Sequence, residues 1–417
     1  MTNSVLNQCL CCGSGRLHIV LDLHTQPPAN LYLREPNTNL PKFPLCLNRC
    51  GECWHAQLSW NVNRNDIFDE YAYVSGTSKT LQNYFAWFSA ALQETINHGA
   101  RVLEIAANDG SLIQAMQEKG FICTGVDPAK NIVASANRNG LPLQLGYWPE
   151  ASAQIAGLFD VIIGMNVLAH VDAPLEFLLG CKQKLTAAGV VIIQPSQARM
   201  FENGEFDSVY HEHISFFNSR SIAKLATRAG LRLVDTALVK IHGDSPVYFL
   251  QHIENSDAAP TFSAFRTGDF AINENLIEYE QRVRLFDERT YQKFAEVAYE
   301  VIDNLKEVVT EHKAMGFKIA FVGAAAKAIT LLNASEIQPD HLLDEAPLKV
   351  GMYAPGCNII VEPLTAVTKW TKPTLFILSA WNFRIELSEK LVMLGVPPGS
   401  KFYSYFPHPQ WIEHSQD

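Results

Sequence analysis

The segment SVYHEHISFF, residues 208–217, places a phenol, two imidazoles and a carboxylate at four consecutive positions, from Tyr210 to His213. A core strand would not choose three ionisable neighbours, and a surface loop has little use for the aromatic residues beside them. An imidazole can take up a proton near neutral pH, a carboxylate can orient it, and a phenol can donate to a developing oxyanion. A hydrogen-bonded structural cluster explains these four residues about as well, so the rest of the chain must supply the reagent on which they would act.

A strand, a tight turn and a helix are predicted for VLEIAANDGSLIQAM. Glu104 ends the strand, and Asn108, Asp109 and Gly110 make the turn. One strand later Asp127 ends GVD, at the position where doubly wound folds bind a ribose diol. The dinucleotide fingerprint G-x-G-x-x-G is absent, which disfavours NAD and FAD. A nucleoside cofactor without a pyrophosphate fits this turn, and we expect S-adenosylmethionine.

The cysteines are concentrated near the N-terminus, in CLCC and CGEC. Cys9-x2-Cys12 and Cys50-x2-Cys53 each place two thiolates on one turn, where both can bind one ion. Together they complete a tetrahedral S4 site that suits zinc, and no position remains open for water or substrate. We therefore expect one structural zinc. Buried or redox-active cysteines are the alternative.

Five segments must position these groups. Residues 1–60 form the zinc-binding domain, and residues 61–98 form a helical linker rich in aromatic side chains. Residues 99–253 alternate short apolar strands with amphipathic helices, which is typical of a parallel α/β sheet. Residues 254–315 are a helical connection. Residues 316–417 begin a second strand–turn–helix unit, FKIAFVGAAAKAITLLNA, followed by the apolar stretches LKVGMY and TLFILSAW.

The composition of the chain limits the classes of protein to which it can belong. With 47% hydrophobic and 18% charged residues, the chain of 417 residues is typical of a globular protein of two or three domains. The net charge of −10 argues against a nucleic-acid partner, because phosphate binding needs clustered Lys and Arg. The first residues, MTNSVLNQCL, do not read as a leader, and the longest apolar stretch is too short to span a bilayer. We expect no membrane partner and a cytoplasmic location.

Several motifs are spread over nearly the whole chain: the two CxxC pairs, YAYVSGTS, LEIAANDGSL, MNVLAHV, FDSVYHEHISFF, and VGAAAKAITLLN with GMYAPG. They resemble the zinc-containing sugar C-methyltransferases, which build branched deoxysugars from nucleotide-linked ketosugars, and YHEH is the most specific of them. The resemblance implies an α/β protein of three parts. These are a small N-terminal zinc-binding domain, a central Rossmann-like class I methyltransferase domain, and a C-terminal degenerate Rossmann-like domain, with the sugar nucleotide held between domains.

By this resemblance, the reaction is methylation of a nucleotide-linked 4-ketosugar, with C3 as the favoured carbon. That carbon becomes nucleophilic when a base removes its hydrogen and a donor stabilises the enolate oxygen. We expect His213 to be the base, Glu212 to orient and polarise a histidine, and Tyr210 to donate to the oxyanion. The resemblance adds His170 of LAHV to the catalytic site.

Further site residues are expected from the same motifs. Of the two tyrosines in YAYVS, we prefer Tyr71 as the catalytic one, which leaves Tyr73 to contact the substrate. Lys327 lies in the first turn of a predicted helix and suits a phosphate of the nucleotide, although a packed Ala-rich turn explains VGAAAKAI nearly as well. Asn166 and Ala106 join the cofactor-binding set. The family usually has Gly at position 106, and a methyl group is tolerated there if the local φ is negative.

The substrate is less determined than the reaction, because HGDSP at 242–246 stands where HGGS and a basic residue are common. One alternative keeps the cofactor but replaces the sugar by another enolisable ketone or an electron-rich ring. Another is a zinc-stabilised binding protein that has lost activity, for which Ala106 is the warning. Binding of S-adenosylmethionine separates this last alternative from the two enzymes.

Overall fold

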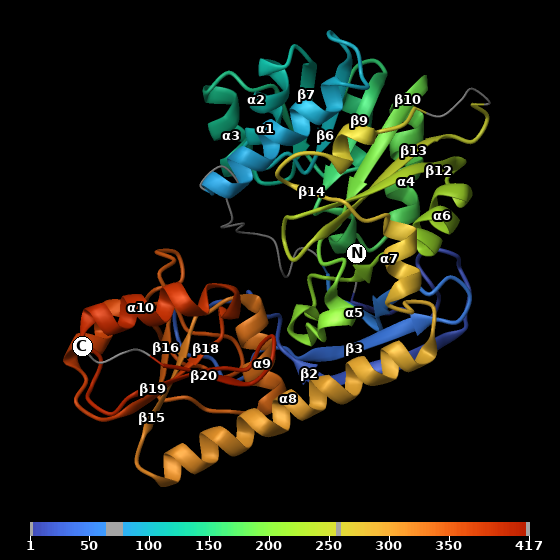
Figure 1. The fold of residues 1–417 in the computed structure, drawn as a ribbon. Coiled ribbons are helices and arrows are strands. Elements are labelled where there is room, and N and C mark those ends of the chain that lie inside the picture. The colour runs from blue at the N-terminus through green and yellow to red at the C-terminus, as the bar shows by residue number, and fades with distance from the viewer. Residues whose placement is uncertain (1–2, 64–77, 256–259, 414–417) are drawn as a thin grey trace.

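The computed structural model describes residues 3–63, 78–255 and 260–413, and its three larger sheets mark three regions of the chain (Figure 1). Figure 1 shows the central region above the other two, with the helix α8 running along the base beneath the N-terminal and C-terminal regions. Within the described ranges, no helix combines the length and the apolar composition needed to cross a bilayer.

The N-terminal region is built on a four-stranded antiparallel sheet, ordered β11-β4-β3-β2. Three of its strands are local: β2 Leu17–Gln26, β3 Phe43–Cys50 and β4 Ala56–Leu58. The fourth, β11, is Ser215–Phe216, which comes from the YHEH segment far along the chain. A separate pair joins β1 Ser4–Val5 to β5 Trp60–Asn61. The region predicted to bind zinc is therefore completed by the segment predicted to do chemistry.

The central region contains an eight-stranded sheet of order β14-β12-β13-β10-β9-β6-β7-β8. Its strands are β6 Arg101–Ile105, β7 Ile122–Asp127, β8 Leu143–Leu145, β9 Phe159–Met165, β10 Leu185–Gln194, β12 Leu231–Val239, β13 Ser245–His252 and β14 Ala271–Ile272. The strands from β8 to β10 are parallel, as predicted for a parallel α/β sheet, whereas β13 runs antiparallel to both of its neighbours. The short turn between β12 and β13 explains why these two strands are antiparallel, because closely connected neighbouring strands pair antiparallel. His242, Gly243 and Asp244 all have positive φ in it.

Helices cover both faces of this sheet. On one face lie α1 Lys79–Gln93, α2 Ser111–Glu118 and α3 Lys130–Arg138, whose apolar side chains pack with Val161 and Ile163 of β9. On the other face lie α4 Pro174–Lys184, α6 Ser219–Arg228 and α7 Leu276–Arg282, packed with Ile162. Successive residues of a strand point to opposite faces, which is why its apolar run is continuous. This doubly wound arrangement positions the strand ends where cofactors bind.

The C-terminal region has a six-stranded sheet of order β17-β16-β15-β18-β19-β20, parallel except for the edge strand β20. Its elements are β15 Lys318–Val322, α9 Ala326–Ser335, β16 His341–Leu343, β17 Val361–Glu362, β18 Thr374–Leu378, α10 Arg384–Leu394, β19 Lys401–Ser404 and β20 Gln410–Ile412. The stretch LKVGMY is a turn rather than an element of the sheet, since Gly351 adopts a φ of 87° there. Numbered in chain order, the strands follow the 3-2-1-4-5-6 pattern of dinucleotide-binding folds.

The helical connection is two helices, α7 and α8 Glu288–Ala314, interrupted at Arg284, whose φ is 54°. Asp287 caps α8 by accepting from the backbone N–H of Arg289. The buried face of α8 belongs to one hydrophobic core with β2, β3, β4, α9 and β15. The N-terminal and C-terminal regions therefore share a core. Short helices complete the chain: α5 Met200–Asn203, η3 Glu150–Gln154, η4 Leu168–His170, η5 Phe206–Ser208, η6 Ser263–Arg266, η7 Leu364–Lys369 and η8 Trp381–Phe383.

Candidate active site

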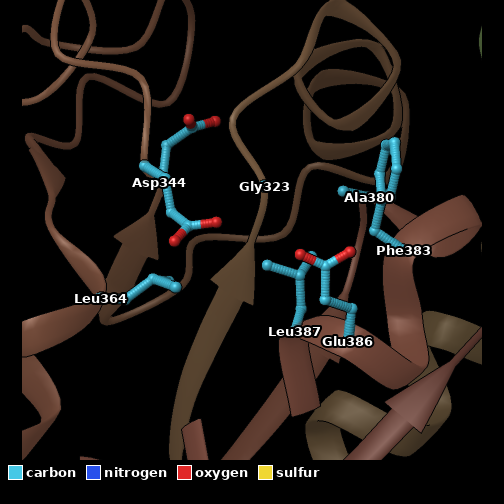
Figure 2. A pocket seen from close by; sticks show the side chains of 8 residues that line it. Gly323, Asp344, Leu364, Ala380, Phe383, Glu386 and Leu387 are labelled. Atoms are coloured by element: carbon cyan, nitrogen blue, oxygen red, sulfur yellow. The ribbon is translucent and has the colours of Figure 1, made fainter. Parts of the chain in front are cut away.

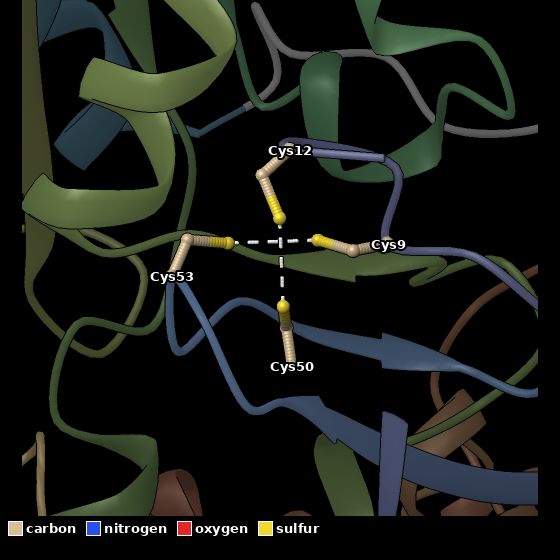
Figure 3. A group of neighbouring side chains, drawn as sticks. All are labelled: Cys9, Cys12, Cys50 and Cys53. Carbon is tan, nitrogen blue, oxygen red and sulfur yellow. Dashed lines mark hydrogen bonds between the residues drawn. The ribbon is translucent and has the colours of Figure 1, made fainter. Parts of the chain in front are cut away.

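The four predicted zinc ligands converge. Figure 3 shows the sulfurs of Cys9, Cys12, Cys50 and Cys53 pointing toward one centre, and all four lie within 4.8 Å of one another. The Sγ atoms of Cys9 and Cys53 are 3.5 Å apart and those of Cys12 and Cys50 are 3.6 Å apart. In a tetrahedron with Zn–S bonds of ~2.3 Å the sulfurs are ~3.8 Å apart, so only small shifts separate these four sulfurs from the geometry of a zinc site. The residues fit a closed S4 zinc.

The turn after β6 is fastened to the end of β7 by Asp127. Its two carboxylate oxygens accept from the backbone N–H groups of Asn108, at 2.9 Å, and Ala129, at 2.8 Å. Burial raises the pKa of Asp127, against these two hydrogen bonds. Glu104 is also buried, and its pKa is raised well above the usual range by burial first and then by the charges of Asp127 and Asp109. The predicted cofactor-binding residues of this turn thus lie together at the carboxyl edge of the sheet.

Three buried polar atoms at this edge have no hydrogen-bond partner in the described part of the chain. They are Oε2 of Glu104, Oδ1 of Asn166 and Nε2 of Gln194. Their strands β6, β9 and β10 are neighbours, so the three side chains belong to one strip of the sheet edge. Orphaned buried polar atoms are rare because each one costs free energy. A ligand that offers both donors and acceptors, as the amino-acid and ribose groups of S-adenosylmethionine do, would satisfy them.

Gln194 was missing from the predicted set. It ends the apolar run of β10, and the hydroxyl of Tyr84 on α1 donates to its Oε1. The signal in the sequence was present, because a polar residue closing a buried parallel strand lies where ligands bind in such sheets. Three other predicted residues of the cofactor set, Asn166, Asp109 and Gly110, lie on loops leaving the same edge.

The condition under which a methyl group is tolerated at position 106, a negative φ, is not met, because the φ of Ala106 is 59°. The residue lies in the left-handed region, together with Asn108 and Asn166 at 49° and Gly110 at 79°. Asparagine and glycine occupy that region readily, whereas alanine is penalised by contact between its Cβ and the backbone. The turn therefore keeps its shape at a local cost in stability.

Replacing Ala106 by Gly should stabilise the protein by about 1 kcal/mol, because it removes that contact. Chemical denaturation measures the change. The matched control is Ala107→Gly, at a neighbour without positive φ, which should destabilise by about 0.5–1 kcal/mol. Equal destabilisation by both changes would contradict the backbone conformation described for this turn.

Asp127→Asn should weaken S-adenosylmethionine binding by about tenfold or more, since a hydrogen bond to a charged group contributes about 1.5–3 kcal/mol. Isothermal titration calorimetry measures the affinity. Asp160→Asn, at the opposite end of the sheet where Asp160 accepts from the N–H of Arg101, is the control and should leave the affinity unchanged. Unchanged affinity in Asp127→Asn would remove Asp127 from the cofactor site.

In the YHEH segment, Tyr210 and His213 form a hydrogen-bonded pair whose tautomer is fixed. His213 Nδ1 lies 2.9 Å from the carbonyl oxygen of Ser208, which can only accept, so Nδ1 carries the proton. Nε2 then has a lone pair and accepts from the Tyr210 hydroxyl at 2.8 Å. Burial, followed by the nearby His170 and by Lys327, holds the pKa of His213 well below its usual range. The imidazole is therefore neutral at neutral pH, the form that can take up a proton.

His170 connects this pair to the methyltransferase sheet. It ends η4, directly after β9, and its Nδ1 lies 2.7 Å from the carbonyl oxygen of Glu212. Its ring centroid is 5.0 Å from that of His213. The backbone N–H of Ile214 also donates to the carbonyl of Ala169, at 2.8 Å. Since β9 is the neighbour of β6, these hydrogen bonds attach the YHEH segment to the same edge of the sheet as the cofactor turn.

The expected role of Glu212 as the partner of a histidine is wrong for its side chain. Both carboxylate oxygens accept from Nδ2 of Asn30, at 2.8 and 2.9 Å. Burial raises the pKa of Glu212 to about 7, while Asn30 and the charge of Lys349 act in the opposite direction. Only the backbone carbonyl of Glu212 touches an imidazole, that of His170. Residues 211 and 212 form a turn, so sequence spacing alone could not indicate which group each side chain would meet.

Lys327 lies in the first turn of α9, as predicted, but carboxylates surround it here. Its Nζ is 3.5 Å from Oε2 of Glu205 and 3.7 Å from Oδ1 of Asp207, and 5.1 Å from the Trp381 ring centroid. The indole N–H of Trp381 donates to Asp207 at 3.0 Å. A phosphate would have to displace or share these carboxylates, so its role as a phosphate ligand stays a prediction.

Two predicted site residues, Tyr71 and Tyr73, lie outside the described residues. Two others were missed. Asn30 lies in PPAN of the N-terminal region, and Lys349 lies in the turn LKVGMY, where its Nζ donates to the carbonyl of Ala324 at 2.8 Å. The sequence did not indicate a role for Lys349, because its neighbours in LKVGMY are mostly apolar, as in a buried strand.

Comparison with known proteins agrees with this arrangement. One family model, described as a C-methyltransferase C-terminal domain, matches residues 241–407; a methyltransferase-domain model matches 78–236, and a zinc-binding-domain model matches 9–68. The chain is 28% identical over 422 residues to the C-methyltransferase NovU of Streptomyces niveus, covering 98% of this chain and 97% of NovU. This protein is thus similar along nearly its whole length to a C-methyltransferase, and its matched segments are a zinc-binding domain, a methyltransferase domain and a C-methyltransferase C-terminal domain. It is an enzyme whose cofactors are S-adenosylmethionine and one zinc, so the non-catalytic alternative is set aside.

Other relatives cover the central region alone. The ubiquinone biosynthesis O-methyltransferase of Caulobacter sp. (strain K31) is 38% identical over 101 residues, which are 23% of this chain and 40% of that protein. Among solved structures, the magnesium protoporphyrin IX methyltransferase ChlM from Synechocystis PCC 6803 is 15% identical, with a TM-score of 0.34, covering 41% of this chain and 83% of that one. A structural similarity with so low a TM-score is not evidence of a shared function.

Proposed function

We propose that this enzyme methylates the carbon next to the ketone of a nucleotide-linked 4-keto-deoxysugar, most simply at C3. The observation that carries the proposal is the Tyr210–His213 pair, a neutral imidazole with an unprotonated Nε2 beside a phenol. Methylation of oxygen or nitrogen does not require a carbanion. Methylation of this carbon does, and it needs a base together with an oxyanion donor.

In the proposed reaction, Nε2 of His213 takes the proton from the carbon next to the ketone, and the electron pair moves into the enolate. The Tyr210 hydroxyl leaves Nε2 and donates to the enolate oxygen. The strip from Glu104 to Gln194 would hold S-adenosylmethionine, whose sulfonium would supply the methyl group. The enolate carbon would form the new C–C bond as the S–CH3 bond breaks, with S-adenosylhomocysteine as the leaving group. His170 keeps the segment aligned with this strip through the Glu212 carbonyl. Burial of His213 excludes water, which would otherwise compete for the enolate.

A cavity of about 260 Å³ in the C-terminal region supports a nucleotide on the substrate. It lies at the carboxyl ends of β15, β16 and β18, the point at which the strand order reverses and where such folds bind nucleotides. Figure 2 shows the carboxylates of Asp344 and Glu386 on either side of the turn at Gly323, with Phe383 at the rim. These groups suit ribose hydroxyls and the face of a base.

Asp344 repeats the arrangement of Asp127. Its oxygens accept from the backbone N–H of Ala324, at 2.6 Å, and of Ala346, at 2.7 Å, so it closes the turn after β15 as Asp127 closes the turn after β6. The carbonyl of Ala324 in turn accepts from Lys349, whose charge acts on Glu212. Hydrogen bonds therefore join the cavity to Lys349, and the charge of Lys349 acts on the YHEH segment. A nucleotide in the cavity would place its sugar toward that segment, with the diphosphate near Lys349 and Lys327.

Solvent-deuterium exchange tests the proposal. The enzyme, with S-adenosylhomocysteine bound to prevent methyl transfer, is incubated in D2O with a nucleotide-linked 4-ketosugar. We expect exchange at C3 well above that without enzyme. Exchange in a simple ketone or methylation of an electron-rich ring, with none in the ketosugar, would favour the other small-molecule substrates raised by the sequence.

A further inference from the structure

The zinc-binding region contacts the YHEH segment at many points. The strand β11 pairs with β4, Nε2 of His211 lies 3.3 Å from the carbonyl of Phe43, and Nε2 of His55 lies 3.2 Å from the hydroxyl of Ser215. The Asn218 side chain donates to the carbonyl of Trp54 at 2.8 Å. The segment is therefore shaped by the zinc-binding region as much as by the methyltransferase sheet.

One of these contacts reaches a side chain rather than the backbone. Asn30 Nδ2 is within 2.9 Å of both oxygens of Glu212, which is 7% exposed. Asn30 itself is exposed, so it covers the carboxylate from the solvent side. Nearby, the hydroxyl of Tyr32 donates to the carbonyl of Ala324 at 2.5 Å, and the backbones of Leu33 and Tyr353 pair. The stretch 30–33 thus bridges the YHEH segment and the C-terminal turn that carries Lys349.

We infer that the zinc-binding region supplies a working part of the active site: Asn30 is a positioning residue that holds the Glu212 side chain, ionised, opposite Lys349. A neutral amide donor on both oxygens stabilises the carboxylate over the acid. The carboxylate then attracts the charge of Lys349, which lies on the C-terminal turn. This attraction keeps the proposed nucleotide site aligned with the Tyr210–His213 pair. The inference rests on the proposed function for the purpose of this alignment, whereas the contact between Asn30 and Glu212 is part of the structure.

The pH dependence follows from the groups that face Glu212. The charge of Lys349, from the C-terminal turn, acts on the carboxylate, and His170 of η4 meets the backbone carbonyl of Glu212. Burial lowers the pKa of His170 and holds the pKa of His213, the next residue in the segment, well below its usual range. The pKa of Glu212 is raised by burial to about 7 and is held there against further increase by Asn30 and then Lys349. Loss of Asn30 should therefore raise the pKa of Glu212, and an activity that needs the ionised form should decline at neutral pH and recover at higher pH.

The test compares Asn30→Ala with Asn39→Ala, an exposed residue of the same region. In Asn30→Ala we expect the acidic limb of the exchange profile to move up by about one pH unit, as for the loss of a hydrogen bond to a charge. Asn39→Ala should match the native enzyme. S-adenosylmethionine affinity, measured by calorimetry, should be unchanged in both. Asn30→Asp, which places a second carboxylate there, should shift the limb further.

Infrared titration makes the result independent of the substrate. The carboxyl band of Glu212, taken from the difference between native enzyme and Glu212→Gln, should protonate at higher pH when Asn30 is Ala. If that shift occurs but the native enzyme exchanges no ketosugar, the proposed function fails while the role of Asn30 stands. If the band and the exchange profile are both unmoved by Asn30→Ala, the inference is overturned.

Discussion

His213→Ala should abolish deuterium exchange next to the ketone, by about 10²–10⁴-fold, while S-adenosylmethionine binds with native affinity. The expectation follows from the fixed tautomer: Nδ1 donates to Ser208, so Nε2 is the nitrogen that can accept the carbon's proton. The hydroxyl of Tyr210 lies 2.8 Å from this nitrogen. Exchange by NMR and binding by calorimetry are measured on the same preparation, so that a folding defect is recognised as lost binding.

The matched control is His211→Gln, two residues earlier in the same segment. His211 is buried and faces the carbonyl of Phe43 in the zinc-binding region, so a glutamine amide can keep that contact. We expect most of the exchange activity to remain. A second comparison, Glu212→Gln, tests the neighbouring carboxylate. If exchange survived in His213→Ala but disappeared in Glu212→Gln, the base would be Glu212, and the role given to His213 would be wrong.

Cys50→Ser should remove the zinc and with it the activity. Structural zinc in small domains contributes about 10–16 kcal/mol to folding, more than most domains have in total. In this protein the destabilisation should extend beyond the zinc-binding region. The metal ligands pack in the core of the central sheet, and β2 to β4 share a core with α8 and the C-terminal region. We expect a lower Tm, no zinc by elemental analysis, and at least about a 100-fold loss of turnover.

Cys46→Ala is the control, since Cys46 is a buried cysteine of β3 outside the four-sulfur cluster. It should retain one zinc per chain and most of the activity, with only the modest destabilisation of a small core cavity. Full activity in a zinc-free Cys50→Ser enzyme would show that the YHEH segment does not depend on the zinc-binding region. That result would also count against the inference drawn for Asn30.

The sequence predicted the features that depend on local pattern. The CxxC pairs, the turn at Asn108–Gly110, the strand ending at Asp127 and the other parallel strands of the central sheet have local signals, since thiolate spacing and apolar runs are set by neighbouring residues. The antiparallel β13 was missed because its apolar run looks like that of a parallel strand. Only the tight turn before it, with three left-handed residues, fixes its direction.

Contacts between distant segments were beyond sequence reasoning. Glu212 was expected to meet a histidine, because imidazoles flank it in the chain. It meets Asn30, which β-strand pairing and a shared core bring from far away. Lys349 was overlooked for the same reason, as its role depends on the carbonyl of Ala324 and on Glu212 rather than on its neighbours.

The most direct test of carbon methylation is to follow a labelled methyl group. The enzyme is incubated with S-adenosylmethionine bearing a 13C-methyl group and with a nucleotide-linked 4-ketosugar, and the product is examined by NMR. We predict that the label is bonded to the carbon next to the ketone, with loss of that carbon's hydrogen. A label on oxygen or nitrogen would contradict the chemistry assigned to Tyr210 and His213.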